Sequence, residues 1–311
     1  MPHPQPSRLL PLLLACALLG PAACSDDGAP RGDDGAVSEE EDNETTPGES
    51  GSKAAVTVGS GDSASTSLVG ALYAEVLEHA DYRVTRRLQY GTRPAYLEAL
   101  EEGGLDVVPD LVGELAVFLG AAVGAGTGPA EARAAVDDAL PEGLVTLEPS
   151  QAASTSVLVV TGEDRTEGMG SVSDLAGMEG GAEVGGRRSL DGLDVPGARL
   201  RPLDGGGPLT KEALTQGTID VAVLASTDGA IGVNGWVVLE GAPPLEPPGN
   251  VLAVGRADAL DDEARALLAE VHAVLTPEDF IALNKRVGIG QEDPEEVARD
   301  YAADRGLLGD S

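Results

Sequence analysis

From Ala54 onward, short runs rich in β-branched residues alternate with longer stretches of helical periodicity, and this alternation constrains the fold more than any other feature. Alternation of this kind predicts an α/β fold in which parallel strands are covered by helices. The length from Ala54 to the end favours two lobes over one, given the usual size of a domain. We expect strands at 55–59, 81–88, 105–109, 156–161, 181–184, 219–224, 235–240 and 251–254. We expect helices at 68–80, 93–102, 112–123, 129–139, 211–216, 261–275, 277–287 and 294–301.

The chain is strongly acidic, with 53 acidic against 20 basic residues among 311 and a net charge of −33. This charge makes nucleic acids and anionic membrane surfaces poor partners. A hydrophobic fraction of 42 % is sufficient for a packed core, so the acidity does not imply disorder throughout. Aromatic residues are scarce at 3 %, which leaves few candidates for a ligand site built from stacked rings.

The N-terminus has the features of a secretory signal. Arg8 precedes the apolar run 9–20, which is too short to span a bilayer, and small residues follow it up to Cys24. Two alanines directly before Cys24 resemble the lipobox of bacterial lipoproteins, in which the cysteine is acylated and becomes the first mature residue. Pro21 departs from the leucine usual in that box, so Cys16 and plain secretion remain alternatives. We expect residues 1–24 to be a lipoprotein signal peptide with Cys24 as the lipidated residue.

Residues 25–53 are rich in Asp, Glu, Gly and Ser and show no apolar periodicity. Such a segment cannot bury enough apolar surface to fold. We expect a disordered acidic tether here.

The residue types needed for catalysis are mostly missing. Both cysteines lie within the first 24 residues, and neither His79 nor His272 adjoins a nucleophile motif. The sequence contains no phosphate-binding Gly-rich loop with Lys-Ser/Thr and no metal-ligand cluster at diagnostic spacing. Gly59-Ser60-Gly61 follows an expected strand but lacks the third glycine of a dinucleotide site. We therefore expect no enzyme, no cofactor and no metal.

Ligands of open α/β sheets bind at the carboxyl ends of strands. The loops at those ends are 59–67, 90–94, 109–113, 187–190 and 225–230. We expect these loops to converge on a cleft.

Several collinear blocks resemble the substrate-binding proteins of glycine betaine, choline and carnitine ABC transporters. The resemblance extends from Val56 to Tyr301, and its most specific part is 203–229, which ends in Ala225-Ser226-Thr227-Asp228-Gly229. The matching blocks are 58–60, 105–113, 202–210, 220–229, 247–251, 275–279 with 283–284, and 293–294 with 297–298.

The resemblance implies a two-lobed periplasmic-binding-protein-like fold of type II with a hinged interlobe cleft. One lobe would comprise 54–152 plus 252–311 and the other 153–251, with crossings near 155–158 and 250–252. It also implies a monomeric, extracytoplasmic protein, lipid-anchored to the cell membrane, that captures a quaternary-ammonium or zwitterionic osmoprotectant and delivers it to an ABC permease. The alternative is a sensor or surface interaction lipoprotein with the same fold and a degenerate ligand cage.

The aromatic cage typical of this family is depleted here. The block Val108-Pro109-Asp110-Leu111-Val112-Gly113 stands where relatives often have Tyr-Pro-Glu-Tyr-Thr-Gly, and Ala225-Ser226 replaces a common aromatic. Ser156 and Gly249 also stand where Tyr is frequent. Tyr90 and Tyr96 are the aromatics expected near the cleft. The loss implies either weak betaine binding, with Asp62 and Asp110 as charge partners for the cation, or a different solute.

Arg187 could bind a ligand carboxylate in bidentate fashion or could be a solvated surface residue. Asp228-Gly229 could contribute to the ligand cleft or could simply form a turn, for which these residue types are typical. The residues expected to bind the ligand are Ser60, Asp62, Ser63, Tyr90, Thr92, Asp110, Thr155, Ser156, Arg187, Ser226, Thr227, Asp228 and Asn250.

Overall fold

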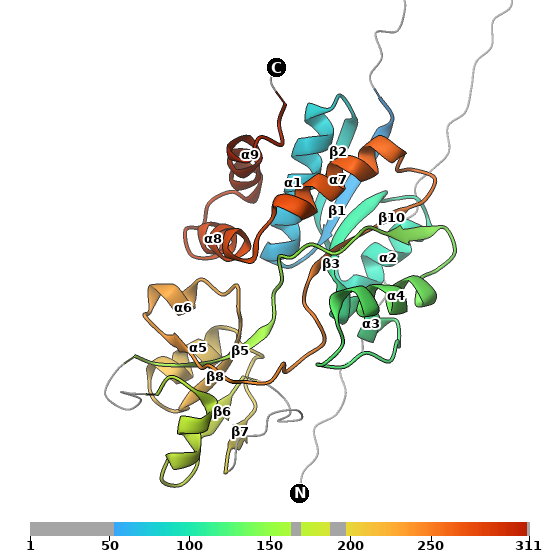
Figure 1. Cartoon of the computed structure of the whole chain (residues 1–311). Helices are drawn as coiled ribbons and strands as arrows, with labels where there is room; N and C mark the ends of the chain where they lie inside the picture. Colours follow the sequence, from blue (N-terminus) through green and yellow to red (C-terminus); the bar gives the residue numbers. More distant parts are fainter. Residues whose placement is uncertain (1–52, 163–168, 187–196, 310–311) are drawn as a thin grey trace, which may run out of the picture. The chain divides into compact units, whose positions relative to one another are not determined.

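The computed structural model describes residues 53–162, 169–186 and 197–309 (Figure 1). The chain divides into two units, Met1–Gly48 and Glu49–Ser311, and all described residues belong to the second. The expected signal peptide, Cys24, nearly all of the expected tether and Arg187 lie outside the described residues.

The first sheet has the strand order β2-β1-β3-β10-β4. β1 pairs in parallel with β2 and β3, whereas β10 pairs antiparallel with β3 and β4. Its strands are β1 (Ala55–Gly61), β2 (Arg83–Gly91), β3 (Val107–Leu111), β4 (Leu144–Thr146) and β10 (Val251–Arg256).

The second sheet has the strand order β7-β6-β8-β5-β9. β6 pairs in parallel with β7 and β8, and β5 pairs antiparallel with β8 and β9. Its strands are β5 (Ser156–Val160), β6 (Glu183–Gly185), β7 (Arg199–Arg201), β8 (Val221–Ala225) and β9 (Val237–Val238).

Both sheets are mixed, which corrects the prediction of parallel strands. The antiparallel members β5 and β10 directly follow the two segments that connect the sheets. A strand that continues from such a crossing enters its sheet from the opposite end to a strand that follows a helix on the sheet face, so it runs against its neighbours.

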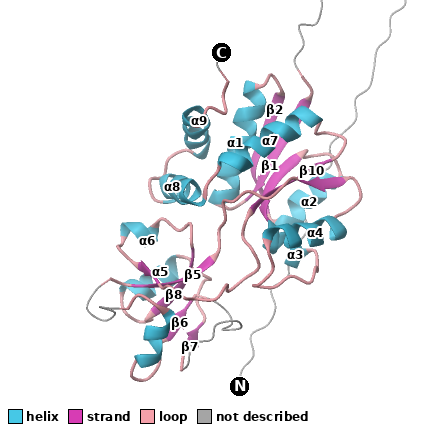
Figure 2. Cartoon of the chain, viewed as in Figure 1, coloured by secondary structure: helices cyan, strands magenta, loops and turns pink. Residues whose placement is uncertain are grey.

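Helices cover both faces of the first sheet (Figure 2). Alternate residues along β10 belong to different cores: Val251 and Ala253 pack with α1 and α7, whereas Leu252 and Val254 pack with α2 and α3. The helices are α1 (Ala64–His79), α2 (Arg93–Glu101), α3 (Val112–Phe118), α4 (Pro129–Ala139), α7 (Asp262–Val274), α8 (Pro277–Gly288) and α9 (Pro294–Asp304).

The second sheet is also covered on both faces. Leu158 and Val160 of β5 contribute to one core and Val159 to the other, as the period of two in a strand requires. The covering elements include α5 (Pro208–Thr215), α6 (Ala230–Val233) and a short 3₁₀ helix at Val172–Gly177.

Helix ends account for most differences from the expected boundaries. α1 begins at Ala64, before the expected residue 68, because the Ser63 side chain accepts from Thr66 N and caps the helix. α3 ends at Phe118 instead of continuing to 123, because Gly120 adopts a positive φ of 79° just beyond the end. β4, β7, α6 and the 3₁₀ helix were not predicted, and all are short.

The two connecting segments run side by side between the sheets. Ala153 and Asn250 form an antiparallel bridge, Ser154 N donates to Gly249 O over 2.9 Å, and Val251 N donates to Ala152 O over 2.9 Å. A Cβ on Gly249 would lie 1.6 Å from Ser154 O, so only glycine allows this approach.

Among the described residues, no helix is both long and apolar enough to cross a membrane.

Candidate binding site between the two sheets

The carboxyl ends of β1 and β3 and the starts of α1 and α2 border a hollow that we call pocket A. It has a volume of about 410 Å³ and is lined from the first sheet by residues such as Asp62, Thr92 and Asp110. Ser154, Ala225 and Thr227 line it from the side of the second sheet. Pocket A therefore lies where the two sheets and their connections meet.

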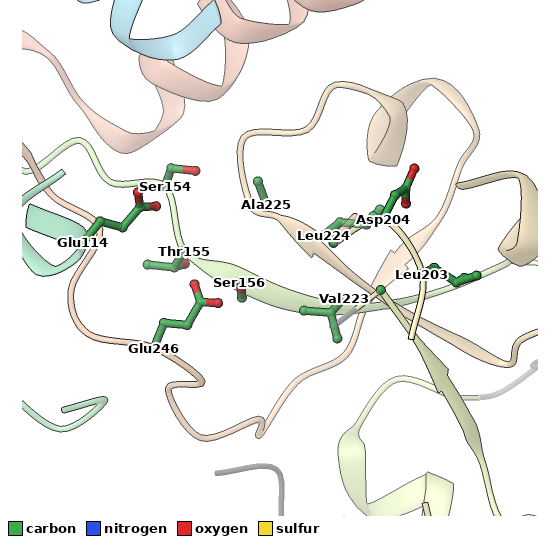
Figure 3. A pocket seen from close by; sticks show the side chains of 12 residues that line it. Glu114, Ser154, Thr155, Ser156, Leu203, Asp204, Val223, Leu224, Ala225 and Glu246 are labelled. Carbon is green, nitrogen blue, oxygen red and sulfur yellow. The ribbon is translucent and has the colours of Figure 1, made fainter. Parts of the chain in front are cut away.

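A second hollow, pocket B, adjoins pocket A on the side of the second sheet and has a volume of about 660 Å³ (Figure 3). Glu114, Ser154 and Ala225 line both pockets. Thr155 and Ser156 contribute to pocket B from β5. The two pockets thus share part of their walls.

A buried ion pair forms one wall of pocket A. The Asp110 side chain is 1 % exposed and accepts from Arg93 Nε over 2.9 Å and from Arg93 Nη2 over 2.8 Å. It also accepts from Tyr96 Oη over 2.5 Å and from Leu111 N over 2.7 Å. The carboxylate is therefore fully engaged within the protein.

The surroundings shift the pKa values of both partners of Asp110. Burial lowers the pKa of Arg93, but the hydrogen bonds and charge of Asp110 outweigh it and raise that pKa overall. Burial, together with the Asp110 charge, raises the pKa of Tyr96. Arg93 stays cationic and Tyr96 stays neutral at any physiological pH.

Arg93 also reaches the rim of pocket A. Its Nη2 donates to Glu114 Oε2 over 2.9 Å, and its guanidinium carbon lies 6.0 Å from the centre of the Phe118 ring. Glu114 is 59 % exposed at its side chain, so this second pair is much better solvated than the pair with Asp110.

The structure brings most of the predicted ligand-binding residues to these pockets. Asp62, Ser63, Thr92, Asp110 and Thr227 line pocket A, and Thr155 and Ser156 line pocket B.

Ser226 and Asn250 lie beside the connecting segments. Ser226 Oγ accepts from Thr155 N over 3.1 Å, and Asn250 Nδ2 donates to Ser150 O over 2.9 Å. Asp228 pairs with Lys211 over 2.6 Å and accepts from Ala230 N, as a turn residue does. It borders a smaller hollow together with Thr227 and Asn284.

Ser60 and Tyr90 lie apart from pockets A and B. Ser60 is fully buried, and its hydroxyl accepts from Gln89 N over 2.8 Å and donates to Gly61 O, which ties β1 to β2. Tyr90 is 38 % exposed near the end of β2.

Sequence reasoning missed Arg93 and Glu114, which line pocket A, and named Tyr96 only as an aromatic near the cleft. The available signal was a basic residue inside the expected ligand loop 90–94 of an otherwise acidic chain. Its partner could not be read from the sequence, because the Arg93–Asp110 pair depends on how α2 packs beside β3.

No group of metal-binding side chains occurs among residues 53–162, 169–186 and 197–309.

Solved structures of known proteins share this fold. Apo YehZ from Escherichia coli matches with 24 % identity and a TM-score of 0.66, over 81 % of this chain and 99 % of that one. A glycine betaine/carnitine/choline ABC transporter structure matches with 20 % identity and a TM-score of 0.68 over the same shares. Lactococcal OpuAC complexed with glycine betaine matches with 15 % identity and a TM-score of 0.54, over 82 % and 98 %. A search of curated protein sequences found no significant match.

Two mixed α/β sheets joined by paired crossings, with pockets between them, define a two-lobed fold of the periplasmic-binding-protein type II class. Residues 54–304 match the family model of OpuAC, the substrate binding domain of ABC-type glycine betaine transport systems. The chain belongs to this family of ABC-transporter substrate-binding proteins, which is not a family of enzymes.

Proposed function

We propose that this protein is the extracytoplasmic binding component of an ABC importer that captures a small quaternary-ammonium or zwitterionic osmoprotectant and delivers it to the permease. The observation that carries the proposal is pocket A, because both sheets contribute to its wall and its size suits a small solute. The lobes would be 54–152 plus 252–311 and 153–251, with the paired segments around Ser154 and Gly249 as the hinge.

The related structures support this ligand class. One is described as a glycine betaine/carnitine/choline transporter and another holds glycine betaine. Pocket A carries Asp62, Asp110 and Glu114 against Arg93, so its lining attracts a cationic group. The small hydroxylated residues at its rim leave space for a methylated ammonium.

We further propose that Cys24 carries a lipid that anchors the protein to the outer side of the cell membrane. The support is the position of Cys24 after an apolar run and two alanines. A monomer would suffice, because the ligand site is built from one chain.

One observation favours a second candidate function. Among the described residues that line pocket A, Tyr96 is the only aromatic one, and its hydroxyl donates to Asp110. A pocket without a ring cage binds quaternary ammonium ions less tightly, since each ring contributes about 0.5–2 kcal/mol. A sensor or surface interaction lipoprotein with this fold would tolerate that loss.

A thermal-shift panel tests the proposal on the full chain, with glycine betaine, choline, carnitine, proline betaine and ergothioneine. A ligand at about 100 times its dissociation constant adds about 2.7 kcal/mol to the free energy of unfolding. We expect at least one of these solutes to raise the melting temperature. If all five leave it unchanged at millimolar concentration, the osmoprotectant function is wrong and the sensor is favoured.

A further inference from the structure

Within the described part of the chain, Arg93 uses two of its three guanidinium nitrogens for hydrogen bonds. Nε and Nη2 donate to Asp110, and Nη2 also donates to Glu114. Nη1 makes no hydrogen bond or ion pair with the described part of the chain, although Arg93 lines pocket A. Two strong N–H donors of a permanent cation are thus left for something else at this wall.

The arginine is held in place before any ligand arrives. Its bidentate contact is with a carboxylate that is 1 % exposed, and Tyr96, itself buried, donates to the same carboxylate. Fork-to-fork pairing fixes both the position and the plane of a guanidinium. A ligand bound by Arg93 would therefore lose little free energy to ordering of this side chain.

Three helices begin at pocket A, and one of them, α3, has the acidic Glu114 in its first turn. α1 and α2 have no acidic residue in their first turns, whereas α7, α8 and α9 each have two. Thr92, the N-cap residue of α2, makes no side-chain capping bond and lines the pocket. The exposed amides at a helix start attract negative charge, which adds to the effect of Arg93.

We propose that Arg93 binds the carboxylate of a zwitterionic ligand through Nη1, and that Asp110 and Tyr96 are positioning residues that hold its guanidinium. This inference rests on the proposed function and narrows the ligand to an ammonium compound that carries a carboxylate, such as a betaine, in preference to a cation such as choline. Asp62, which also lines pocket A, would then serve the ammonium end. Asp110, which the sequence suggested as a partner for that cation, acts instead through Arg93.

Calorimetric titration of the full chain with glycine betaine and with choline tests this assignment. The informative variant is Arg93→Gln with Asp110→Asn, because Arg93→Gln alone would leave a buried, unpaired carboxylate. A charge-assisted pair is worth roughly 10- to 100-fold in affinity. We expect the double variant to lose that factor for glycine betaine while its choline affinity stays within about threefold, since choline carries no carboxylate for the pair to hold. The control is Arg256→Gln, another ion-paired arginine, which lines neither pocket and should leave both affinities unchanged.

Glu114→Gln gives an independent measurement that does not disturb the buried pair. The Glu114 carboxylate pairs with Arg93 Nη2 and would repel a ligand carboxylate at the neighbouring Nη1, so its neutralisation should tighten glycine betaine binding severalfold. Weaker betaine binding by this variant, or an equal loss of both ligands in the double variant, would overturn the inference. Wild-type protein that binds choline but not glycine betaine also overturns it and leaves the proposed function standing. Binding of none of the five solutes of the thermal-shift panel contradicts both.

Discussion

Leu111 and Val108 both replace a tyrosine of the family pattern, but they differ in burial and in whether they line the ligand pocket. Both stand where relatives of this family often have tyrosine. Leu111 is partly buried and lines pocket A, whereas Val108 is fully buried in the core between β3 and α2. A tyrosine at position 111 could therefore place an aromatic ring at the ligand site without disturbing the fold, whereas one at position 108 could not.

Leu111→Tyr should therefore strengthen binding of quaternary ammonium solutes. A single ring over a cation contributes about 0.5–2 kcal/mol, which corresponds to roughly 2- to 30-fold in affinity. Titration calorimetry with choline and glycine betaine measures the change. Val117→Tyr, on the exposed side of α3, is the matched control and should change neither affinity. An affinity gain in the control, or none in Leu111→Tyr, contradicts the placement of Leu111 at the ligand.

His272 gives the folded protein a dependence on pH. It is 4 % exposed, its Nδ1 donates to Glu148 O over 2.6 Å, and its Nε2 accepts from Tyr73 Oη over 2.5 Å. Burial lowers the pKa of His272 below its usual 6.5, although the bond to Glu148 opposes the shift. The stability that the neutral ring provides is present above pH 6.5 and is lost as pH falls through the folded-state pKa.

The melting temperature of the wild-type protein should consequently fall more steeply between pH 7.5 and pH 5 than that of His272→Gln. Thermal unfolding followed by circular dichroism at several pH values gives both slopes. His79→Gln removes an exposed histidine and should keep the wild-type slope. Parallel slopes for the wild type and His272→Gln would show that the buried ring is not the titrating group. Carboxylates whose pKa values are lowered, such as Asp279, lose their contribution only below the usual 3.8.

At the scale of elements, the paired segments between the sheets are the most constrained part of the backbone. Gly249 lies against Ser154, and Gly113 at the start of α3 lies against Pro247 and Pro248, where a Cβ would come within 2.6 Å. The crossing, the start of α3 and the wall of pocket A are thus built on close backbone contacts. Ser154 belongs both to this crossing and to the pocket.

Gly249→Ala should destabilise the protein by about 1–3 kcal/mol or more, because the added carbon would overlap Ser154 O and the segments would have to separate. Urea denaturation measures the change in the free energy of unfolding. Gly232→Ala in α6 is the matched control: nothing lies within 4 Å of its Cβ, and we expect no loss of stability. Equal stability of the two variants would show that the segments at Gly249 are not in close contact.

The strongly periodic elements could be predicted from the sequence, whereas strand direction and the short elements could not. α4 begins and ends at the predicted residues, because Pro129 starts it and its apolar residues repeat at helical spacing. The antiparallel course of β5 and β10 depends on which lobe each crossing enters, and hydrophobic patterning does not encode this. β7 was not predicted, and β9 is shorter than the predicted strand 235–240. These strands have three and two residues, too few to show a hydrophobic alternation.

The candidate site was predictable to a similar degree. The rule that ligands bind at strand ends placed Asp62, Thr92 and Thr227 at loops that do line pocket A. It did not reveal that Asp110 forms a buried ion pair, because the partner comes from the preceding helix, α2, and the sequence does not show which carboxylate Arg93 reaches. Ser60 was predicted to bind the ligand, but its hydroxyl instead accepts a hydrogen bond from Gln89 N and holds β1 to β2.

At the scale of the whole molecule, the net charge of −33 bears on location and on ligand selection. An acidic surface keeps a protein soluble and disfavours nucleic acid, while it raises the local concentration of cationic solutes. Within pocket A, the positive charge of Arg93 opposes this negative potential at one wall. The protein is thereby suited to a ligand that carries both charges.

Cys24→Ser should move the protein from the membrane fraction to the soluble fraction when the full-length chain is expressed in a bacterial host. Fractionation and the mass of the mature N-terminus report the change, since an acylated cysteine adds the mass of its lipid. Cys16→Ser is the matched control and should remain in the membrane fraction. Retention of the Cys24→Ser variant in the membrane would mean that another residue is acylated.

Calorimetric titration of the wild-type chain with glycine betaine tests directly whether the protein binds a betaine. We expect one binding site per chain and tighter binding than for choline, because pocket A is a single site with Arg93 in its wall. Absence of any binding heat for glycine betaine, at several temperatures and with the protein folded by circular dichroism, would contradict this expectation.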